Sequence, residues 1–326
     1  MDQEFHYWIT GVIAKRAGFP EETAKTIAYA AQYVDDNDMR RTITDPGGGP
    51  DYEAYISQTM NIFKPKRELM RIYSIFHFLP GKPDAESARR GDGKMHILTT
   101  TPDSDLTRMV LNAALDTRDP HRIGVAAHTY ADSWAHQNFV GWPESINGQA
   151  LNPLPNIGHA DFVHHPDWVG HAWQDERILA SDVNNNHRFL SAAKRLFEAF
   201  CTATGGPARN GWNGLESDLR QAMGPVATGN KLKGEDARLR AYHDLFPGLP
   251  EYDEHAWFKD AVHTRVRGLP DDTPGLTLFK DSYTWKPGWQ DSNWFRFQEA
   301  VKAHQAFCMV QLTPIFEQMG VDLHAH

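Results

Sequence analysis

A ten-residue stretch, HTYADSWAHQ, places two histidines and an aspartate at four-residue intervals: His128, Asp132 and His136. At about 3.6 residues per turn, side chains at i, i+4 and i+8 lie on nearly the same face of an α-helix. Imidazole and carboxylate groups are common ligands of zinc and iron in proteins. The stretch therefore predicts a helix face that binds metal, although the same spacing also arises by chance on packed helices.

Other histidines and aspartates stand near apolar segments in the first half of the chain. These candidate ligands are His6, Asp35, Asp36, His77, His159, Asp161, His164, His165 and Asp167. A lone buried histidine is more often a hydrogen-bonded core residue than a ligand, so each of these is weak evidence by itself. Burying so many titratable groups without a metal would be costly, and the combined set favours a metal cluster.

The order of these motifs resembles the superfamily of zinc-dependent phospholipases C and single-strand nucleases. The matching segments are His6, YVDD at 33–36, FHFL at 76–79, HTYAD at 128–132 and GHAD at 158–161. Residues 14–37 also resemble an uncharacterised bacterial family, which we take to be a distant branch. The resemblance covers residues 1–170. It implies an all-α enzyme that hydrolyses phosphodiesters or phosphomonoesters with a three-zinc cluster.

The resemblance also implies roles for the matching residues. Asp35 would be a metal carboxylate that bridges or orients a metal-bound water, and Asp35 or Asp36 would accept its proton. His77, His128 and Asp132 would be ligands, with Asp132 able to bridge two metals. The chemistry would be metal-assisted hydrolysis, in which two metals lower the pKa of water and neutralise charge on a phosphoryl oxygen.

The remaining implied ligands depart from the family pattern. His136 and His159 would bind another metal, but the histidine after Asp132 comes at a different spacing from that of the family. His6 would serve a third site, which in the family includes the N-terminal amine and carbonyl. The final H-x3-(D/E) pair is not evident, whereas Asp161 and His165 have ligand spacing in the opposite order. We therefore expect two or three zinc ions, with Asp161 and His165 among the ligands.

These residues predict a metal-dependent, zinc-containing hydrolase of a phosphoester such as a phospholipid head group or nucleotide. Trp134, Phe139, Trp142 and Trp168 would line the pocket mouth, although simple packing is the commoner role for each taken alone. One alternative is a di-iron, oxygen-activating enzyme on a helical scaffold, but the Glu-x2-His pairs of that class are missing. Another is a helical protein with a structural metal, but such sites are usually rich in cysteine.

Helical periodicity accounts for most of the elements that must position these residues. We expect helices at about 5–17, 20–36, 104–116, 120–137, 187–200, 214–227, 232–246 and 293–319, and a short helix or extended run at 63–81. Segments 44–53, 82–96, 140–170 and 266–288 are expected to be loops. No strong strand pattern, internal repeat or linker is present. The prediction is therefore one all-α domain over residues 1–326, with most ligands in 1–170, long loops around the cluster, and helices of 187–326 completing the core.

The composition sets further limits. The chain has 326 residues, of which 40% are hydrophobic and 23% charged, so it can bury a sizeable core. Its net charge of −9 argues against an extended nucleic-acid surface. Cys201 and Cys308 lie in apolar helical stretches and are expected to be buried free thiols, and His304 to be a core histidine. With no signal peptide and no long apolar run visible, the sequence predicts a cytoplasmic protein.

Overall fold

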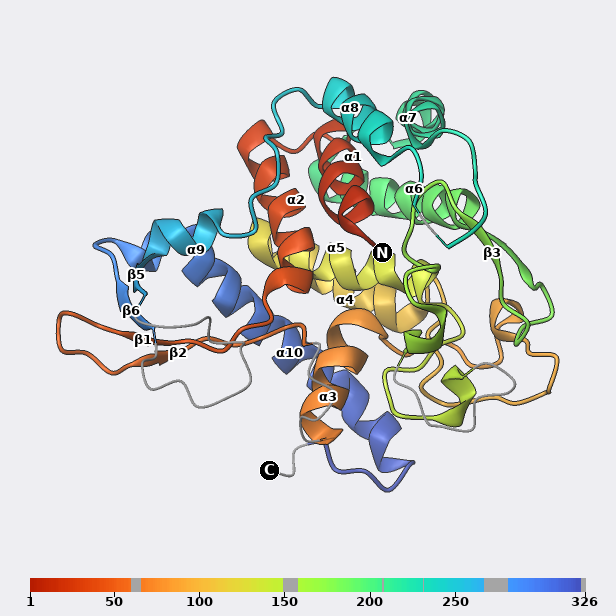
Figure 1. Cartoon of the computed structure of the whole chain (residues 1–326), viewed down its shortest axis with the longest axis horizontal. Helices are drawn as coiled ribbons and strands as arrows, with labels where there is room; N and C mark the ends of the chain where they lie inside the picture. The colour runs from red at the N-terminus through yellow and green to blue at the C-terminus, as the bar shows by residue number, and fades with distance from the viewer. Residues whose placement is uncertain (60–65, 149–157, 207, 231, 267–280, 324–326) are drawn as a thin grey trace.

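The computed structural model describes residues 1–59, 66–148, 158–206, 208–230, 232–266 and 281–323. Helix α5 (Pro120–Ala135) runs through the middle of the molecule and is crossed by α2 (Glu21–Asp36) (Figure 1). The crossing is close because α5 has a glycine there: a Cβ atom on Gly124 would lie 2.5 Å from Ala30 Cβ and 2.6 Å from Ile27 O. The backbone of α2 therefore lies directly against α5.

Helix α5 is buried on all sides from His121 to Ala135. It begins where the sequence predicts: Pro120 is the first helical residue, and the Asp119 side chain accepts a hydrogen bond from His121 N at 3.0 Å. Three further helices pack around it, namely α4 (Asp105–Thr117), α6 (Asn185–Thr204) and α10 (Asn293–Glu317). The histidines and aspartate of α5 consequently lie in the interior.

Two π-helical turns interrupt the regular helices. The first, Glu4–Ile9, leads into α1 (Thr10–Arg16), and the second, Tyr73–His77, continues α3 (Lys66–Ile72). Each turn carries one candidate ligand, His6 or His77. Such turns occur frequently at functional sites.

The other helices lie around this centre. They are α7 (Ala208–Met223), α8 (Glu235–Leu245) and α9 (Ala256–Ala261), with single 3-10 turns at Glu86–Ala88, Ser145–Asn147, Ala160–Phe162 and Trp289–Asp291. Helices α7 and α8 lie near α1 and α6, at the top of Figure 1. A continuous cluster of buried side chains extends from Met1 to Leu323, so segments from both halves of the chain contribute to the same core.

The prediction of an all-α fold is wrong, because the helices are accompanied by two small sheets. One sheet has the order β2-β1-β6-β5, and the other pairs β3 with β4. The strands are β1 (Thr42–Thr44), β2 (Tyr52–Glu53), β3 (Ala172–Gln174), β4 (Asp182–Asn184), β5 (Val262–Arg265) and β6 (Ser282–Trp285). Strands this short show too little alternation to be recognised locally. The parallel pairing of Ile43 with Tyr283 also joins segments far apart in the sequence.

Most of the expected helices are confirmed, with small changes at their ends. The helix expected at 187–200 extends over Asn185–Thr204, and the expected C-terminal helix spans Asn293–Glu317 with Pro314 inside it. The helix expected at 214–227 begins earlier, at Ala208, and ends at Met223. Parts of the expected segments, at 63–65, 149–157 and 267–280, lie outside the described residues.

Several side-chain predictions are also tested by the structure. Cys201 and Cys308 are buried free thiols, as expected. His304 is fully buried on α10, where its ring stacks on Phe76 with the centroids 5.3 Å apart, so it is a core histidine. None of the helices in the described parts of the chain is long and apolar enough to cross a lipid bilayer.

Candidate metal centre

Helix α5 supplies the middle of a buried His/Asp cluster. His128 and Asp132 lie one turn apart, and His136 caps the C-terminal end of the helix. Asp132 Oδ2 is 3.2 Å from His128 Nε2 and 3.5 Å from His136 Nδ1. All three side chains are buried. The HTYADSWAHQ motif thus forms one helix face that surrounds a single carboxylate.

Two other elements bring His77 and Asp35 to this face. His77 Nδ1 is 3.3 Å from Asp132 Oδ2 and 3.1 Å from His128 Nε2. Asp35, near the end of α2, has Oδ1 at 3.6 Å from His77 Nδ1 and 3.7 Å from His128 Nε2. The Asp35 side chain is 25% exposed, whereas those of His77, His128 and Asp132 are buried. Solvent therefore reaches this cluster on the side of Asp35.

A second group of potential ligands lies at the end of α5. His136 Nε2 is 3.1 Å from Asp167 Oδ1, and His159 Nε2 is 3.3 Å from Asp167 Oδ2. His159 and Asp167 both come from the segment that begins at residue 158. Ligand atoms of these three residues all lie within 4.8 Å of one another, a separation that one metal ion can bridge.

The amino group of Met1 and the ring of His6 complete the cluster on its third side. The Met1 amine bonds to Asp132 Oδ1 and lies 3.3 Å from Asp167 Oδ1. His6 Nε2 is 3.1 Å from Asp132 Oδ1. His6, Asp35 and His128 also form a group whose ligand atoms lie within 4.8 Å. Asp132 thus contacts groups on every side of the centre.

A buried ion pair holds the first turn of the chain in place. Glu4 accepts hydrogen bonds of 2.6 Å from both Nε and Nη2 of Arg238, on α8. Both side chains are buried. Separating the two charges would leave each of them buried without a partner, which is costly. The pair therefore holds the N-terminal turn against α8.

Four of the imidazoles are oriented by backbone carbonyl groups. In each, one ring nitrogen (the outer nitrogen) lies within hydrogen-bond distance of a carbonyl oxygen and the other (the inner nitrogen) lies closer to an aspartate; in His136 the carbonyl-bonded Nδ1 is also 3.5 Å from Asp132 Oδ2. The distances are 3.0 Å for His77 Nε2 to Ser57 O, 2.8 Å for His128 Nδ1 to Ala31 O, 2.7 Å for His136 Nδ1 to His77 O, and 2.7 Å for His159 Nδ1 to Val163 O. A carbonyl accepts only from an N–H, so the outer nitrogen carries a proton in each ring. Histidine ligands of metals are oriented in this way.

The inner nitrogens and the aspartate oxygens then face one another as two sets of lone pairs. Such contacts repel unless a proton or a metal ion lies between them. A zinc ion binds nitrogen and oxygen ligands at about 2.0–2.2 Å, which places ligand atoms of a tetrahedral site roughly 3.3 Å apart. The contacts among His77, His128, Asp132 and Asp35 range from 3.1 to 3.7 Å. The donor set therefore fits a small divalent cation.

For two of the rings, burial disfavours a proton in place of a metal ion between the imidazole and the carboxylate. It lowers the pKa of His6 to about 3 and that of His159 to about 4. Burial by itself would raise the pKa of Asp132 and Asp167, but the imidazoles and the Met1 amine hold both well below the usual range. Burial opposes the charge on the Met1 amine, but the three aspartates raise its pKa to about 11. Three carboxylates thus face one ammonium, and cations would compensate the excess negative charge.

Asp36 lies outside the three ligand groups, although the sequence offers it beside Asp35 as a proton acceptor. Its Oδ2 accepts hydrogen bonds from the Tyr252 hydroxyl at 2.5 Å and from Gln32 Nε2 at 3.1 Å. Burial raises its pKa to about 6. Asp35, whose Oδ1 faces His77 and His128, is therefore the aspartate of this pair that belongs to the cluster.

The structure also separates the candidates in the histidine-rich loop. Asp161 and His165, expected as ligands, belong to none of the three groups, and His165 Nδ1 instead lies 2.7 Å from His171 Nε2. Asp167 is the residue that meets His159. The sequence includes Asp167 among its candidates, but a loop without periodicity gives no signal that separates it from Asp161 or His165.

The four aromatic residues expected at the pocket mouth have different environments. Trp134 and Phe139 are buried, and Trp134 Nε1 donates to Ser191 Oγ at 3.2 Å, between α5 and α6. Trp142 and Trp168 are partly exposed. Trp168 follows the ligand candidate Asp167 in the sequence, but its ring packs against His164, His165 and His171, which belong to none of the three ligand groups.

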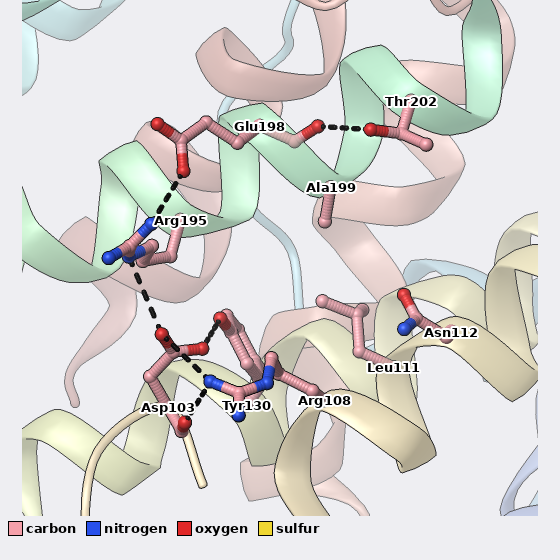
Figure 2. A pocket seen from close by; sticks show the side chains of 9 residues that line it. All are labelled: Asp103, Arg108, Leu111, Asn112, Tyr130, Arg195, Glu198, Ala199 and Thr202. Atoms are coloured by element: carbon pink, nitrogen blue, oxygen red, sulfur yellow. Dashed lines mark hydrogen bonds and ion pairs between the residues drawn. The ribbon is translucent and has the colours of Figure 1, made fainter. Parts of the chain in front are cut away.

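A separate cavity of about 300 Å³ lies between α4, α5 and α6 (Figure 2). Asp103 Oδ1 accepts a hydrogen bond from the Tyr130 hydroxyl at 2.6 Å, and Oδ2 lies 3.2 Å from Arg108 and 3.4 Å from Arg195. Arg195 also bonds to Glu198 at 3.0 Å. These charges compensate one another, and no member of the three ligand groups lines the cavity.

Comparison with known proteins gives a family but no activity. No curated protein and no solved structure matches the chain. One family model, described as a family of unknown function, DUF6765, matches residues 1–312. Because this match covers nearly the whole chain, including every member of the three ligand groups, the protein belongs to the DUF6765 family.

Proposed function

We propose that the protein is a metal-dependent hydrolase of phosphoesters, with zinc as the metal. The observation that carries the proposal is the His/Asp cluster around Asp132, in which carbonyl groups orient four imidazoles toward three carboxylates. The order of motifs shared with zinc-dependent phospholipases C and single-strand nucleases supports the same reaction class. A phospholipid head group and a nucleotide are both substrates of this class.

The residues of the centre would divide the work of this reaction. Bound divalent ions act as Lewis acids on a phosphoryl oxygen and lower the pKa of water. Asp132 would hold the ions from a buried position between the ligand groups. Asp35 would accept a proton, because its carboxylate is the one in the cluster that solvent reaches most easily, at 25% exposure. The buried imidazoles, neutral where burial lowers their pKa, would remain available as ligands near neutral pH.

The first experiment is elemental mass spectrometry on the full chain, purified without a His tag or chelator. We expect two or three zinc ions per chain and turnover of a generic phosphodiester or phosphomonoester. Iron in place of zinc would move the protein to oxygen-activating chemistry. A folded protein without metal would refute the proposal.

A pair of matched variants tests whether the cluster holds the metal. Asp132→Asn keeps the shape of the side chain but removes the shared charge, so metal content and activity should both fall to near zero. Asp36→Asn alters a neighbouring buried carboxylate that bonds to Tyr252, and it should retain the metal content of the wild type. Full metal retention by Asp132→Asn would place the metal elsewhere. The cytoplasmic location expected from the sequence stays a prediction.

A further inference from the structure

Arg188 has neither an ion-pair partner nor a hydrogen-bond partner among the described residues. It lies in the first turns of α6, and its Nη1 atom is sealed from solvent without an acceptor. The other guanidinium nitrogens also lack acceptors, but they are not among the sealed atoms. The residue as a whole is partly exposed, and burial of the guanidinium lowers the pKa of Arg188 to about 9.

The acidic side chain whose charge acts on Arg188, Asp175, is already bonded to another arginine. Asp175 accepts hydrogen bonds from Arg177 Nε at 2.8 Å and from Arg177 Nη2 at 2.7 Å, and both side chains are buried. This two-pronged pair neutralises Asp175. Asp175 is thus engaged by Arg177, which the charge of Asp161 also reaches, and it forms no ion pair with Arg188.

The ring of Trp173 also lies near Arg188 and favours the positive charge of its guanidinium group. The Arg188 guanidinium carbon lies 5.8 Å from the centre of the Trp173 ring, near the outer limit for a cation–π contact. A cation–π contact of this kind does not satisfy the N–H donors. The first turns of a helix are also an unfavourable place for a positive charge and a favourable one for an anion.

Another arginine on the same helix shows the contrast. Arg195, two turns further along α6, pairs with Asp103 and Glu198 (Figure 2). Arg188 has no counterpart of either carboxylate. An arginine presents N–H groups in a fork that matches two oxygens of a phosphate, sulfate or carboxylate.

We propose that Arg188 binds an anionic group, such as a phosphate, sulfate or carboxylate, at a site separate from the metal centre. Two oxygens of the anion would accept from the guanidinium nitrogens that are not sealed, and its charge would compensate that of Arg188, with which Asp175 forms no ion pair. The inference does not depend on the proposed hydrolase function. It applies equally to a free oxyanion and to an anionic group on a larger ligand.

The test measures thermal unfolding of the full-length, metal-loaded chain in sodium sulfate, against sodium chloride at equal ionic strength. Arg188→Gln removes the charge, and Arg195→Gln is the matched control on the same helix. The wild type and Arg195→Gln should show a saturable rise in Tm of several degrees with sulfate. Arg188→Gln should show no such rise, and without sulfate its Tm should equal or exceed that of the wild type, because it no longer buries a guanidinium nitrogen without an acceptor.

Two outcomes would overturn the proposal: a sulfate response in Arg188→Gln as large as that of the wild type, and no response in the wild type. If the first comes with a Tm that is lower than that of the wild type by the same amount at every sulfate concentration, Arg188 serves only packing against Trp173. If Arg188→Gln does not fold, Arg188→Lys replaces it, and the loss of the fork should weaken the response several-fold.

Two further experiments determine whether the metal is involved and which class of anion binds. Repeating the titration after chelator treatment should leave the Arg188-dependent rise in place, whereas a rise that disappears with the metal would assign sulfate to the metal centre and refute the Arg188 site. Inorganic phosphate and acetate, tested in the same way, distinguish tetrahedral oxyanions from carboxylates. Failure of the hydrolase proposal would appear as absent metal or turnover, and it would not alter these results.

Discussion

At the scale of single residues, the centre depends on which ring nitrogen of each histidine carries the proton. The carbonyls of Ser57 and Ala31 fix the outer N–H of His77 and His128, and the inner nitrogens then face Asp132. Loss of one of these hydrogen bonds would leave the imidazole free to rotate, although the histidine itself would still be present. The residues of the centre also differ in the number of candidate ligands that each contacts, and variants should reveal this difference in their metal stoichiometry.

His159 contacts the aspartate at one end of the centre, whereas Asp132 contacts groups on every side. His159→Ala should therefore lose one ion from the metal stoichiometry, with the remaining ions retained. Asp132→Ala should lose most or all of them. Elemental mass spectrometry on both variants, prepared in parallel, measures the difference. Equal losses in the two variants would contradict the division into separate ligand groups.

Asp35 differs from Asp132 in being partly exposed at the edge of the cluster. If Asp35 accepts the proton in a phosphoester hydrolase, Asp35→Asn should lower kcat by about 100-fold or more. Its metal content should change far less than its turnover. Asp36→Asn serves as the control and should keep most of the activity. Parallel losses of metal and turnover in Asp35→Asn would instead make Asp35 a ligand alone.

At the scale of elements, the crossing of α2 and α5 builds the centre. The close approach at Gly124 places the carbonyl of Ala31 against His128 and carries Asp35 to the same side. The π-helical turns that contain His77 and His6 bring two further candidate ligands to the centre. Small changes in helix spacing are therefore expected to affect both stability and metal binding.

Gly124→Ala tests this dependence. The added Cβ would meet Ala30 Cβ at 2.5 Å and Ile27 O at 2.6 Å, so the helices must move apart. We expect the free energy of unfolding to fall by about 1–3 kcal/mol and metal affinity to fall with it. Gly214→Ala, on α7, meets no atom within 4 Å and should raise the free energy of unfolding by up to about 1 kcal/mol. Denaturant unfolding measures both, and a neutral Gly124→Ala would show that the crossing tolerates expansion.

At the scale of the whole molecule, the fold encloses titratable groups that would be hydrated in the unfolded chain. The core surrounds the centre with side chains from both halves of the sequence. Burial keeps the pKa of His6 near 3 and that of His159 near 4, against a usual value of 6.5. The stability of the metal-free protein should therefore depend on pH.

Between pH 6.5 and about 4, the unfolded chain binds protons on these histidines and the folded chain does not. These two histidines therefore do not reduce the free energy of unfolding above pH 6.5. As the pH falls through this window, each lowers it by up to about 1.4 kcal/mol per pH unit. Denaturant unfolding of chelator-treated protein at several pH values measures the slope. His159→Gln should reduce it, and an unchanged slope in that variant would contradict the low pKa of His159.

The sequence by itself determined the parts of this protein that depend on local spacing. Helical periodicity specifies the main helices, because this signal acts within a few residues. The four-residue spacing of His128, Asp132 and His136 specifies a shared helix face for the same reason. These predictions required no knowledge of distant contacts.

Only the tertiary structure decided which distant residues meet that face. It selected Asp35 over Asp36 and Asp167 over Asp161 and His165, because helix crossing and loop path, which local patterns do not encode, determine these contacts. It also brought the Met1 amine to Asp132 and paired β1 with β6 across most of the chain. The strands are short and gain their hydrogen bonds from remote partners, so their formation depends on the assembled fold.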